Sequence, residues 1–157
     1  MKKIIKDRRI VEDAWRLLEA EENWQSLPAT AQIIVPFEQW QTDYESLLAH
    51  FTQGVGVALE NTVEPETIVQ LEKIALITIH FPMFNDGRGY SLARILREQL
   101  QYAGEIRAVG DVLRDQLFYL ARCGFNAFDL KPHENMELEQ VLSAFSSFSK
   151  VYQPMGV

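Results

Sequence analysis

Cysteine and positive charge are scarce in this 157-residue chain, and each shortage excludes a class of site. The single cysteine, Cys123, excludes an internal disulfide, a zinc site made only of cysteines and a cysteine-ligated iron–sulfur cluster. Fifteen basic residues stand against 22 acidic ones, which gives a net charge of −7. Broad surfaces that bind nucleic acid are basic, so we expect no nucleic-acid partner.

Long hydrophobic runs are also missing. The longest, Ile74 to Phe81, is interrupted by Thr78 and His80, and it is far shorter than the roughly 20 residues of a membrane-spanning helix. The basic start of the chain, Met1 to Arg9, is not followed by the apolar segment of a signal peptide. The sequence therefore predicts a cytoplasmic protein with no membrane partner.

Apolar residues make up 47% of the chain, which is enough for one domain with a sizeable core. We predict a single domain over residues 1–157, divided into an N-terminal extension with a strand and a helix (1–30), a βα core (31–131) and a C-terminal helix and tail (132–157). The expected strands are 3–10 (as a strand or a hairpin), 32–35, 54–60, 74–81, 105–109 and 126–130. The expected helices are 11–22, 43–51, 64–71, 90–102, 111–123 and 134–150.

This alternation is typical of an α/β fold built from repeated βα units, with a mainly parallel sheet of about five strands. Two arrangements of the sheet fit the pattern. One is an open doubly wound sheet, and the other is half of a β/α barrel, which a second copy of the chain would complete as a homodimer. In both, ligands bind at the carboxyl ends of the strands.

The first candidate site follows the expected strand 74–81 and opens the next helix. Its residues are Asp86, Gly87, Arg88, Gly89, Ser91 and Arg94. Two glycines let backbone N–H groups point at one ligand, helix N-termini attract anions, and guanidinium groups bind oxyanions. The segment has neither the Gly-Lys-Ser/Thr of a P-loop nor the Gly-x-Gly-x-x-Gly pattern. It therefore predicts either an anion-binding loop or a structural turn in which Asp86 or Ser91 caps the helix.

The second candidate site pairs Arg107, inside an expected strand, with Asp111 at the start of the next helix. A buried charge needs a partner or a cleft, because an unpaired one costs several kcal/mol. Arg107 therefore either forms a structural ion pair or joins the Arg88 loop at one edge of the sheet, where both would hold an anionic small molecule.

Two further side chains lie near the ends of expected strands. His80 shares a strand face with Thr78 and is a candidate base or ligand, although a histidine packed in the core is the commoner case. Glu60 ends the strand 54–60 and is a candidate carboxylate, with a purely structural role as the alternative. No metal ligands at suitable spacing accompany them.

Motifs in the second half of the chain resemble a known family. They are Phe84-Asn85-Asp86-Gly87-Arg88-Gly89-Tyr90-Ser91, Gly104-Glu105, Arg107-Ala108-Val109-Gly110-Asp111 and Arg122-Cys123-Gly124-Phe125. These motifs are similar to those of bacterial domain-of-unknown-function family 934, whose members are described as "probable oxidoreductases" or accessory proteins of assimilatory sulfite reduction. Genes of that family tend to lie beside the sulfite reductase gene. Asn126 departs from the family pattern, since members often carry aspartate there.

The resemblance implies a role in sulfur assimilation, with sulfite reductase as a partner. Electron transfer needs a cofactor or a thiol pair, and the chain has one cysteine and no flavin or nicotinamide fingerprint. No cofactor is evident. We therefore expect an accessory protein that acts by protein contact and by oxyanion binding. The alternative is a small enzyme or binding protein for a phosphorylated or otherwise anionic metabolite, and the sequence leaves open whether the chain catalyses a reaction.

Overall fold

The structure, a computed structural model of the chain, describes residues 2–82, 87–110, 112, 116–130 and 143. Its strands are β1 (Lys2–Lys6), β2 (Arg9–Asp13), β3 (Arg16–Leu17), β4 (Ile33–Pro36), β5 (Gly56–Glu60), β6 (Leu76–Phe81), β7 (Glu105–Gly110) and β8 (Ala127–Leu130). Its α-helices are α1 (Phe37–His50), α2 (Arg88–Arg94) and α3 (Leu117–Cys123). None of the helices in this part of the chain combines the length and the apolar character that crossing a membrane requires.

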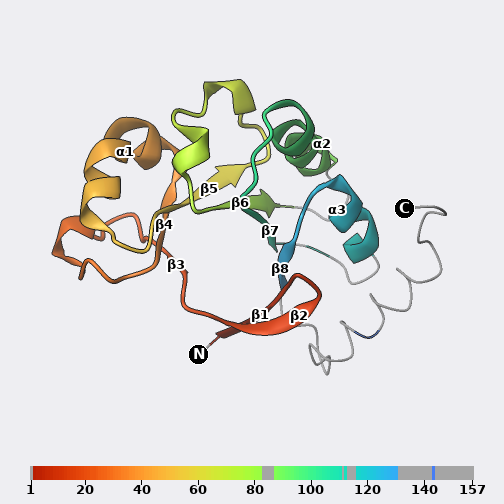
Figure 1. Cartoon of the computed structure of the whole chain (residues 1–157), viewed down its shortest axis with the longest axis horizontal. Helices are drawn as coiled ribbons and strands as arrows, with labels where there is room; N and C mark the ends of the chain where they lie inside the picture. The colour runs from red at the N-terminus through yellow and green to blue at the C-terminus, as the bar shows by residue number, and fades with distance from the viewer. Residues whose placement is uncertain (1, 83–86, 111, 113–115, 131–142, 144–157) are drawn as a thin grey trace.

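All the strands join one eight-stranded sheet in the order β2-β1-β8-β7-β6-β5-β4-β3 (Figure 1). From β3 to β8, neighbours in sequence are neighbours in the sheet and pair in parallel. β1 pairs antiparallel with both β2 and β8. A doubly wound sheet reverses its strand order partway across, so that alternative is wrong. The α/β class, the mainly parallel sheet and the half-barrel shape are confirmed, with more strands than we predicted.

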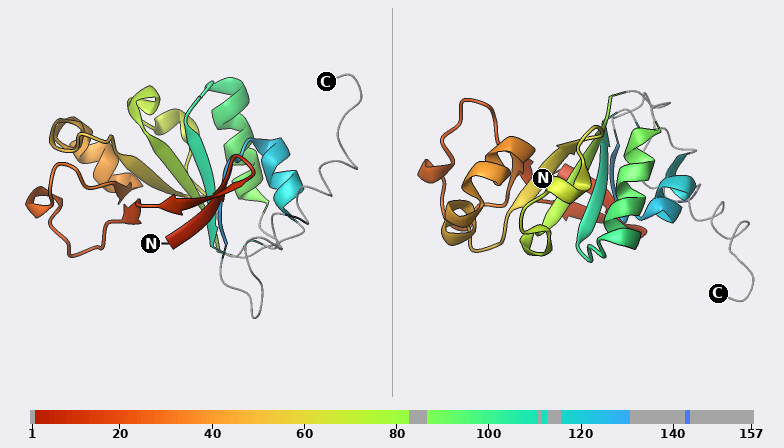
Figure 2. Two further views of the ribbon diagram at one scale, coloured as in Figure 1. Left: turned by 60° about the horizontal axis from the view of Figure 1, so that its bottom comes forward. Right: turned by 90° about the horizontal axis from the view of Figure 1, so that it is seen from above.

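An ion pair between two strands that are not neighbours shows how strongly the sheet curls. Asp13 ends β2, and its Oδ2 lies 2.9 Å from Nη1 of Arg107 in β7, although β1 and β8 lie between these strands in the sheet. In a flat sheet, strands three positions apart are separated by about 14 Å, which is too far for this contact. The sheet therefore curls until the β1–β2 hairpin crosses its open side (Figures 1 and 2).

Helices cover the outer, convex face of the curled sheet (Figures 1 and 2). Because side chains alternate along a strand, every second residue meets this layer: Ile77, Ile79 and Ile106 are fully buried there. They belong to the same apolar core as Trp40 of α1 and Leu92 of α2. The intervening residues of each strand face the concave side, where charged and polar side chains stand among apolar ones.

The segment 11–22 is not the helix that we predicted. Asp7 and Arg8 have positive φ angles of 51° and 63° and form the turn between β1 and β2. β3 follows β2 after two residues. Positive φ at both central residues is typical of a hairpin turn whose twist matches its strands. Pairing of β2 with β1 and the Asp13–Arg107 contact hold residues 11–13 extended. The hairpin alternative for residues 3–10 is confirmed.

Two further predicted helices differ in the structure. α1 begins at Phe37, directly after the strand that ends with Pro36, and residue 43, where we expected its start, is instead a kink (φ −121°, ψ 17°). The predicted helix 64–71 is replaced by two 3-10 turns, Pro65–Thr67 and Leu71–Lys73. Gln70 lies between these turns in the left-handed conformation (φ 49°), which interrupts a helix.

The helices of the second half are shorter than predicted where the structure describes them. The expected helix 90–102 is α2 followed by a π-helical turn, Ile95–Gln99. α3 ends at Gly124, whose positive φ of 117° suits the helix terminus that we predicted there. The predicted helix 134–150 lies outside the described residues apart from Ser143.

Candidate functional site

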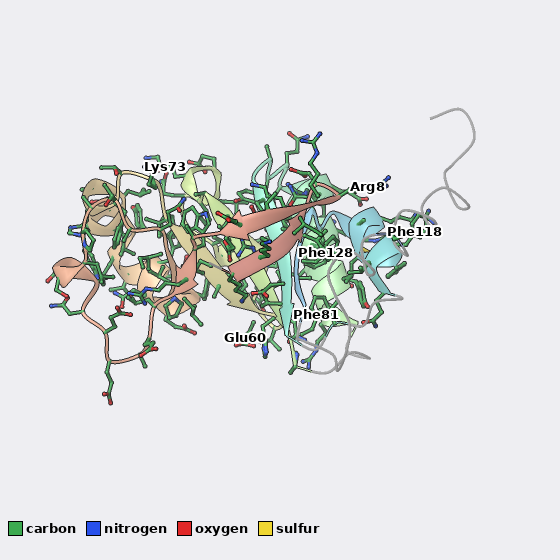
Figure 3. All side chains as sticks on the ribbon, turned by 90° about the horizontal axis from the view of Figure 1, so that it is seen from below. Arg8, Glu60, Lys73, Phe81, Phe118 and Phe128 are labelled. Carbon is green, nitrogen blue, oxygen red and sulfur yellow. The ribbon has the colours of Figure 1, made fainter. Side chains whose placement is uncertain are left out.

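Side chains on the concave face stand in register across the parallel strands. The mouth row, at the carboxyl ends of β5 to β8, is Glu60, His80, Val109 and Asp129. The middle row is Ala58, Thr78, Arg107 and Ala127, and the deep row is Gly56, Leu76 and Glu105. Figure 3 shows Glu60 and Phe81 at the carboxyl end of the sheet, with Lys73 and Arg8 at the opposite end.

A cavity of about 540 Å³ lies over the mouth and middle rows. The N-terminal segment supplies most of its other wall, with Lys2, Asp13, Trp15, Arg16 and Leu17, and Ile34 of β4 completes the lining. A volume of this size accommodates a small molecule. Its place at the carboxyl ends of parallel strands is where β/α proteins bind their ligands.

Arg107 is buried in the wall of this cavity, with its side chain 3% exposed. Its Nε and Nη2 each lie 2.8 Å from Oε2 of Glu105, and its Nη1 lies 2.9 Å from Oδ2 of Asp13. Lys6 completes the network, with Nζ 3.0 Å from Oε1 of Glu105. The charges of the two cations and the two carboxylates in this network cancel. Of our two alternatives for Arg107, the structural ion pair is therefore present, and the same residue also lines the cavity.

Two side-chain pairs at the mouth of the cavity are much more exposed. Nζ of Lys2 lies 2.6 Å from Oδ2 of Asp129, and the two side chains are 58% and 20% exposed. Nδ1 of His80 lies 3.2 Å from Oε2 of Glu60, with exposures of 44% and 70%. Pairs of this kind contribute only about 0–1 kcal/mol. A ligand that offers a new partner can therefore replace either member at little cost.

Gly110 positions the imidazole of His80. Its φ is +97°, and a Cβ at this position would lie 2.5 Å from the carbonyl oxygen of Phe81 and 2.8 Å from Cδ2 of His80. Only glycine lets the ring approach the backbone so closely. When Nδ1 donates to Glu60, Nε2 is left as the basic nitrogen, an arrangement that suits acid–base chemistry.

Arg16 is the third cation that lines the cavity. Its Nη1 and Nη2 donate to the two carboxylate oxygens of Glu22, at 2.8 and 2.5 Å. These hydrogen bonds from Arg16 lower the pKa of Glu22 to about 2. Because both side chains are solvent-accessible, at 49% and 24%, this pair is also open to exchange with a ligand.

The predicted anion-binding loop lies partly in the helix layer. Gly87 precedes α2 and Arg88 opens it, and both are exposed. Gly89 is buried against Phe81, since a Cβ there would lie 2.5 Å from the phenyl ring. Ser91 is exposed on α2.

Arg94 is directed toward α3, where its Nε donates to Sγ of Cys123 at 3.5 Å. None of the described residues that line the cavity comes from α2. The structure thus brings His80 and Arg107 together in one cavity and leaves Ser91 and Arg94 outside its lining. Asp86 and Asp111 lie outside the described residues.

Sequence reasoning missed the whole N-terminal wall of the cavity and Asp129. Asp129 could have been found from the sequence, because side chains two positions apart on a strand share one face, and Asp129 follows Ala127 by two positions on an expected strand. The N-terminal wall gave no local signal, since it depends on the hairpin crossing the sheet. Ala14 and Trp15, which the sequence placed in a helix, are the link between the edge strands β2 and β3.

A comparison with known protein families matches the second half of the chain. Residues 56–157, which begin at β5, match the family described as "Bacterial protein of unknown function (DUF934)". This span contributes Glu60, Thr78, His80, Arg107 and Asp129 to the cavity. Neither the curated proteins nor the solved structures gave a match. The match covers well over half of the chain and agrees with the motifs from Phe84 to Phe125, so the chain belongs to the bacterial family of unknown function DUF934.

Proposed function

We propose that this protein binds a small charged metabolite in the concave cavity at the carboxyl ends of β5 to β8. The observation that carries the proposal is the cavity itself, about 540 Å³ in volume, with ion pairs at its mouth. Small-molecule sites typically combine apolar walls with a few polar groups that converge. Trp15, Leu17 and Ile34 supply the apolar wall here, and Lys2 and His80 are among the polar groups.

A phosphorylated or otherwise anionic metabolite is the first ligand class to consider. Lys2 and Arg16 line the cavity, and each is held by a carboxylate in a solvent-accessible pair. Ammonium and guanidinium groups bind oxyanions well. An anion at this site exchanges with Asp129 or Glu22 as the partner of these cations.

Thermal unfolding tests the binding proposal directly. Phosphate and sulfite should raise the Tm of the wild type and of Lys73→Met, a matched control at the amino end of the sheet (Figure 3). The shift should be smaller in Lys2→Met, because Lys2 lines the cavity. Equal shifts in all three proteins would place the anion elsewhere, and the absence of any shift would remove anion binding.

A second candidate function is an accessory role in assimilatory sulfite reduction. The resemblance of the motifs to a family whose members are described as accessory proteins of sulfite reduction supports it, and the match over residues 56–157 is to that same family, whose description names no function. The acidic segment 17–87 adds a physical reason, because a strongly acidic segment suits a basic partner protein. Its exposed carboxylates include Glu19, Glu21, Glu38, Glu45, Glu64, Glu66 and Glu72.

Affinity purification from cells grown with sulfate as the sole sulfur source tests this second role. We expect the tagged protein to retain sulfite reductase, visible by its haem-type absorbance. Replacing Glu64, Glu66 and Glu72 together by lysine should release the reductase, whereas Lys73→Met should retain it. An eluate without reductase, even after cross-linking in the cells, would contradict the accessory role and leave the small-molecule site standing.

A further inference from the structure

We infer that the ligand of the concave cavity is a zwitterion, a small molecule that carries one cationic and one acidic group. The inference rests on the proposed small-molecule site, because it names the class of ligand that the same cavity takes. It follows from the balance and the exposure of the charges that line the cavity.

The charges of the cavity cancel among the described residues that line it. Its cations are Lys2, Arg16 and Arg107, and its carboxylates are Asp13, Glu60 and Asp129. Their further partners are Lys6, Glu22 and Glu105, which add no positive excess. Strong attraction for a purely anionic ligand needs such an excess, so at these described residues an anion binds less tightly than a ligand that also carries a cationic group.

The charged side chains below the mouth row are buried and paired with one another. Arg107 and Asp13 are each 3% exposed, and Glu105 is 8% exposed. Removing one partner from a buried pair leaves an uncompensated charge, which is strongly unfavourable. A ligand therefore meets the exchangeable charges of Lys2, Asp129 and Glu60 at the mouth, together with the accessible Arg16–Glu22 pair beside them.

A ligand of a single charge fits poorly between these groups. An anion that takes Lys2 competes with Asp129, which is only 20% exposed and lies 2.6 Å from the lysine nitrogen. The displaced carboxylate then lies beside the new anion without a partner. A cation that binds Glu60 avoids this conflict but leaves the Lys2–Asp129 pair closed, so it gains one contact where a zwitterion gains two.

A zwitterion gives every charge an opposite neighbour. Its acidic group binds Lys2, and its cationic group binds Asp129 or Glu60. Between His80 and Asp129 the mouth row holds Val109, which is apolar. Val109 stands beside Asp129 on the neighbouring strand, so the carbon chain of a short zwitterion held between Lys2 and Asp129 lies against this apolar side chain.

Three ligands of equal carbon skeleton test the inference: 2-aminoethanesulfonate, ethanesulfonate and ethylamine. At constant ionic strength, we expect the Tm shift with the zwitterion to exceed the shifts with the other two added together. If ethanesulfonate alone gives an equal shift, the ligand is an anion, so the inference is wrong and the proposed site stands. If ethylamine alone gives an equal shift, the inference is also wrong. If none of the three shifts the Tm, and neither phosphate nor sulfite does, both proposals fail.

A variant of the mouth sharpens the result. Asp129→Asn removes the carboxylate that competes for Lys2, so the preference should move from the zwitterion toward ethanesulfonate. We expect the ratio of the two dissociation constants to change by about tenfold, equivalent to about 1.4 kcal/mol. Lys73→Met should leave the ratio unchanged. Should Asp129→Asn not fold, Glu60→Gln gives the same test, since Glu60 is 70% exposed. An unchanged ratio in the variant that folds would overturn the inference.

Discussion

The two ends of the curled sheet use charged side chains in opposite ways. At the amino end, the guanidinium of Arg97 donates to the carbonyl oxygens of Gly124, Tyr102 and Gly104, at 2.9, 2.7 and 2.6 Å. Burial lowers the pKa of Arg97. At the carboxyl end, Lys2 and His80 pair with side chains that are open to solvent.

The difference lies in what each charge is bound to. Backbone carbonyls cannot move away, so Arg97 acts as a fixed brace between the helix layer and the starts of β7 and β8. Exposed side chains can turn away, so the mouth pairs can open for a ligand. The charged groups that stabilise the fold and those that a ligand can bind thus lie at opposite ends of the strands, with the buried Arg107 network between them.

Breaking that network should have the largest effect. Arg107→Met leaves Asp13 and Glu105 as buried carboxylates without their main partner, and we expect a loss of about 3–5 kcal/mol in the free energy of unfolding. Urea denaturation measures this loss, with Arg9→Met as an exposed arginine control on β2. A loss below about 1 kcal/mol would mean that the network adds no more stability than a surface pair.

The amino-end brace should come next. Arg97→Met removes every hydrogen bond from the guanidinium to the carbonyl groups, and hydrogen bonds to charged groups contribute about 1.5–3 kcal/mol. We expect a loss in that range for the whole set, because the carbonyl oxygens gain access to water. The folded variant should still bind cavity ligands, since Arg97 lies at the opposite end. Lost binding at full stability would contradict the separation of the two ends.

The sequence predicted the apolar strands of this fold and its half-barrel alternative, because alternation and length are local signals. It also placed His80 and Thr78 on one face of a strand. It could not predict the N-terminal wall, because the contacts that hold it are distant in sequence: Asp13 meets Arg107 across 94 residues, and Lys2 meets Asp129 across 127. The spacing of Trp15 and Leu18 is typical of a helix, and the sequence holds no local signal of the distant contacts that place this segment beside the sheet instead.

Alkaline pH should lower the stability of the protein through Tyr102, which is buried at the amino end of the sheet. Tyr102 is buried, its hydroxyl donates to the carbonyl oxygen of Ile74 at 2.9 Å, and burial raises its pKa well above the usual value. The unfolded chain ionises this tyrosine near pH 10 while the folded chain does not, so stability that is complete below about pH 10 falls above it.

Tyr102→Phe should remove this alkaline loss, at a constant cost of about 1 kcal/mol for the missing hydrogen bond. Urea midpoints at pH 8 and pH 11 in each protein measure the difference. Tyr119→Phe is the control, because Tyr119 is 50% exposed. The same alkaline loss in Tyr102→Phe as in the wild type would assign the effect to another group.

The smallest change in stability should come from the mouth itself, where Glu60→Gln removes the partner of His80. Glu60 is 70% exposed, so we expect less than about 0.5 kcal/mol of change in the free energy of unfolding. The Tm shift with 2-aminoethanesulfonate should nevertheless fall, because one of the two carboxylates available to its cationic group is gone. Binding and stability are then affected by different residues, as the comparison of the two ends requires. A large loss of stability in Glu60→Gln would make the mouth a structural region like the amino end, since a pair that holds the fold together is not one that a ligand can open.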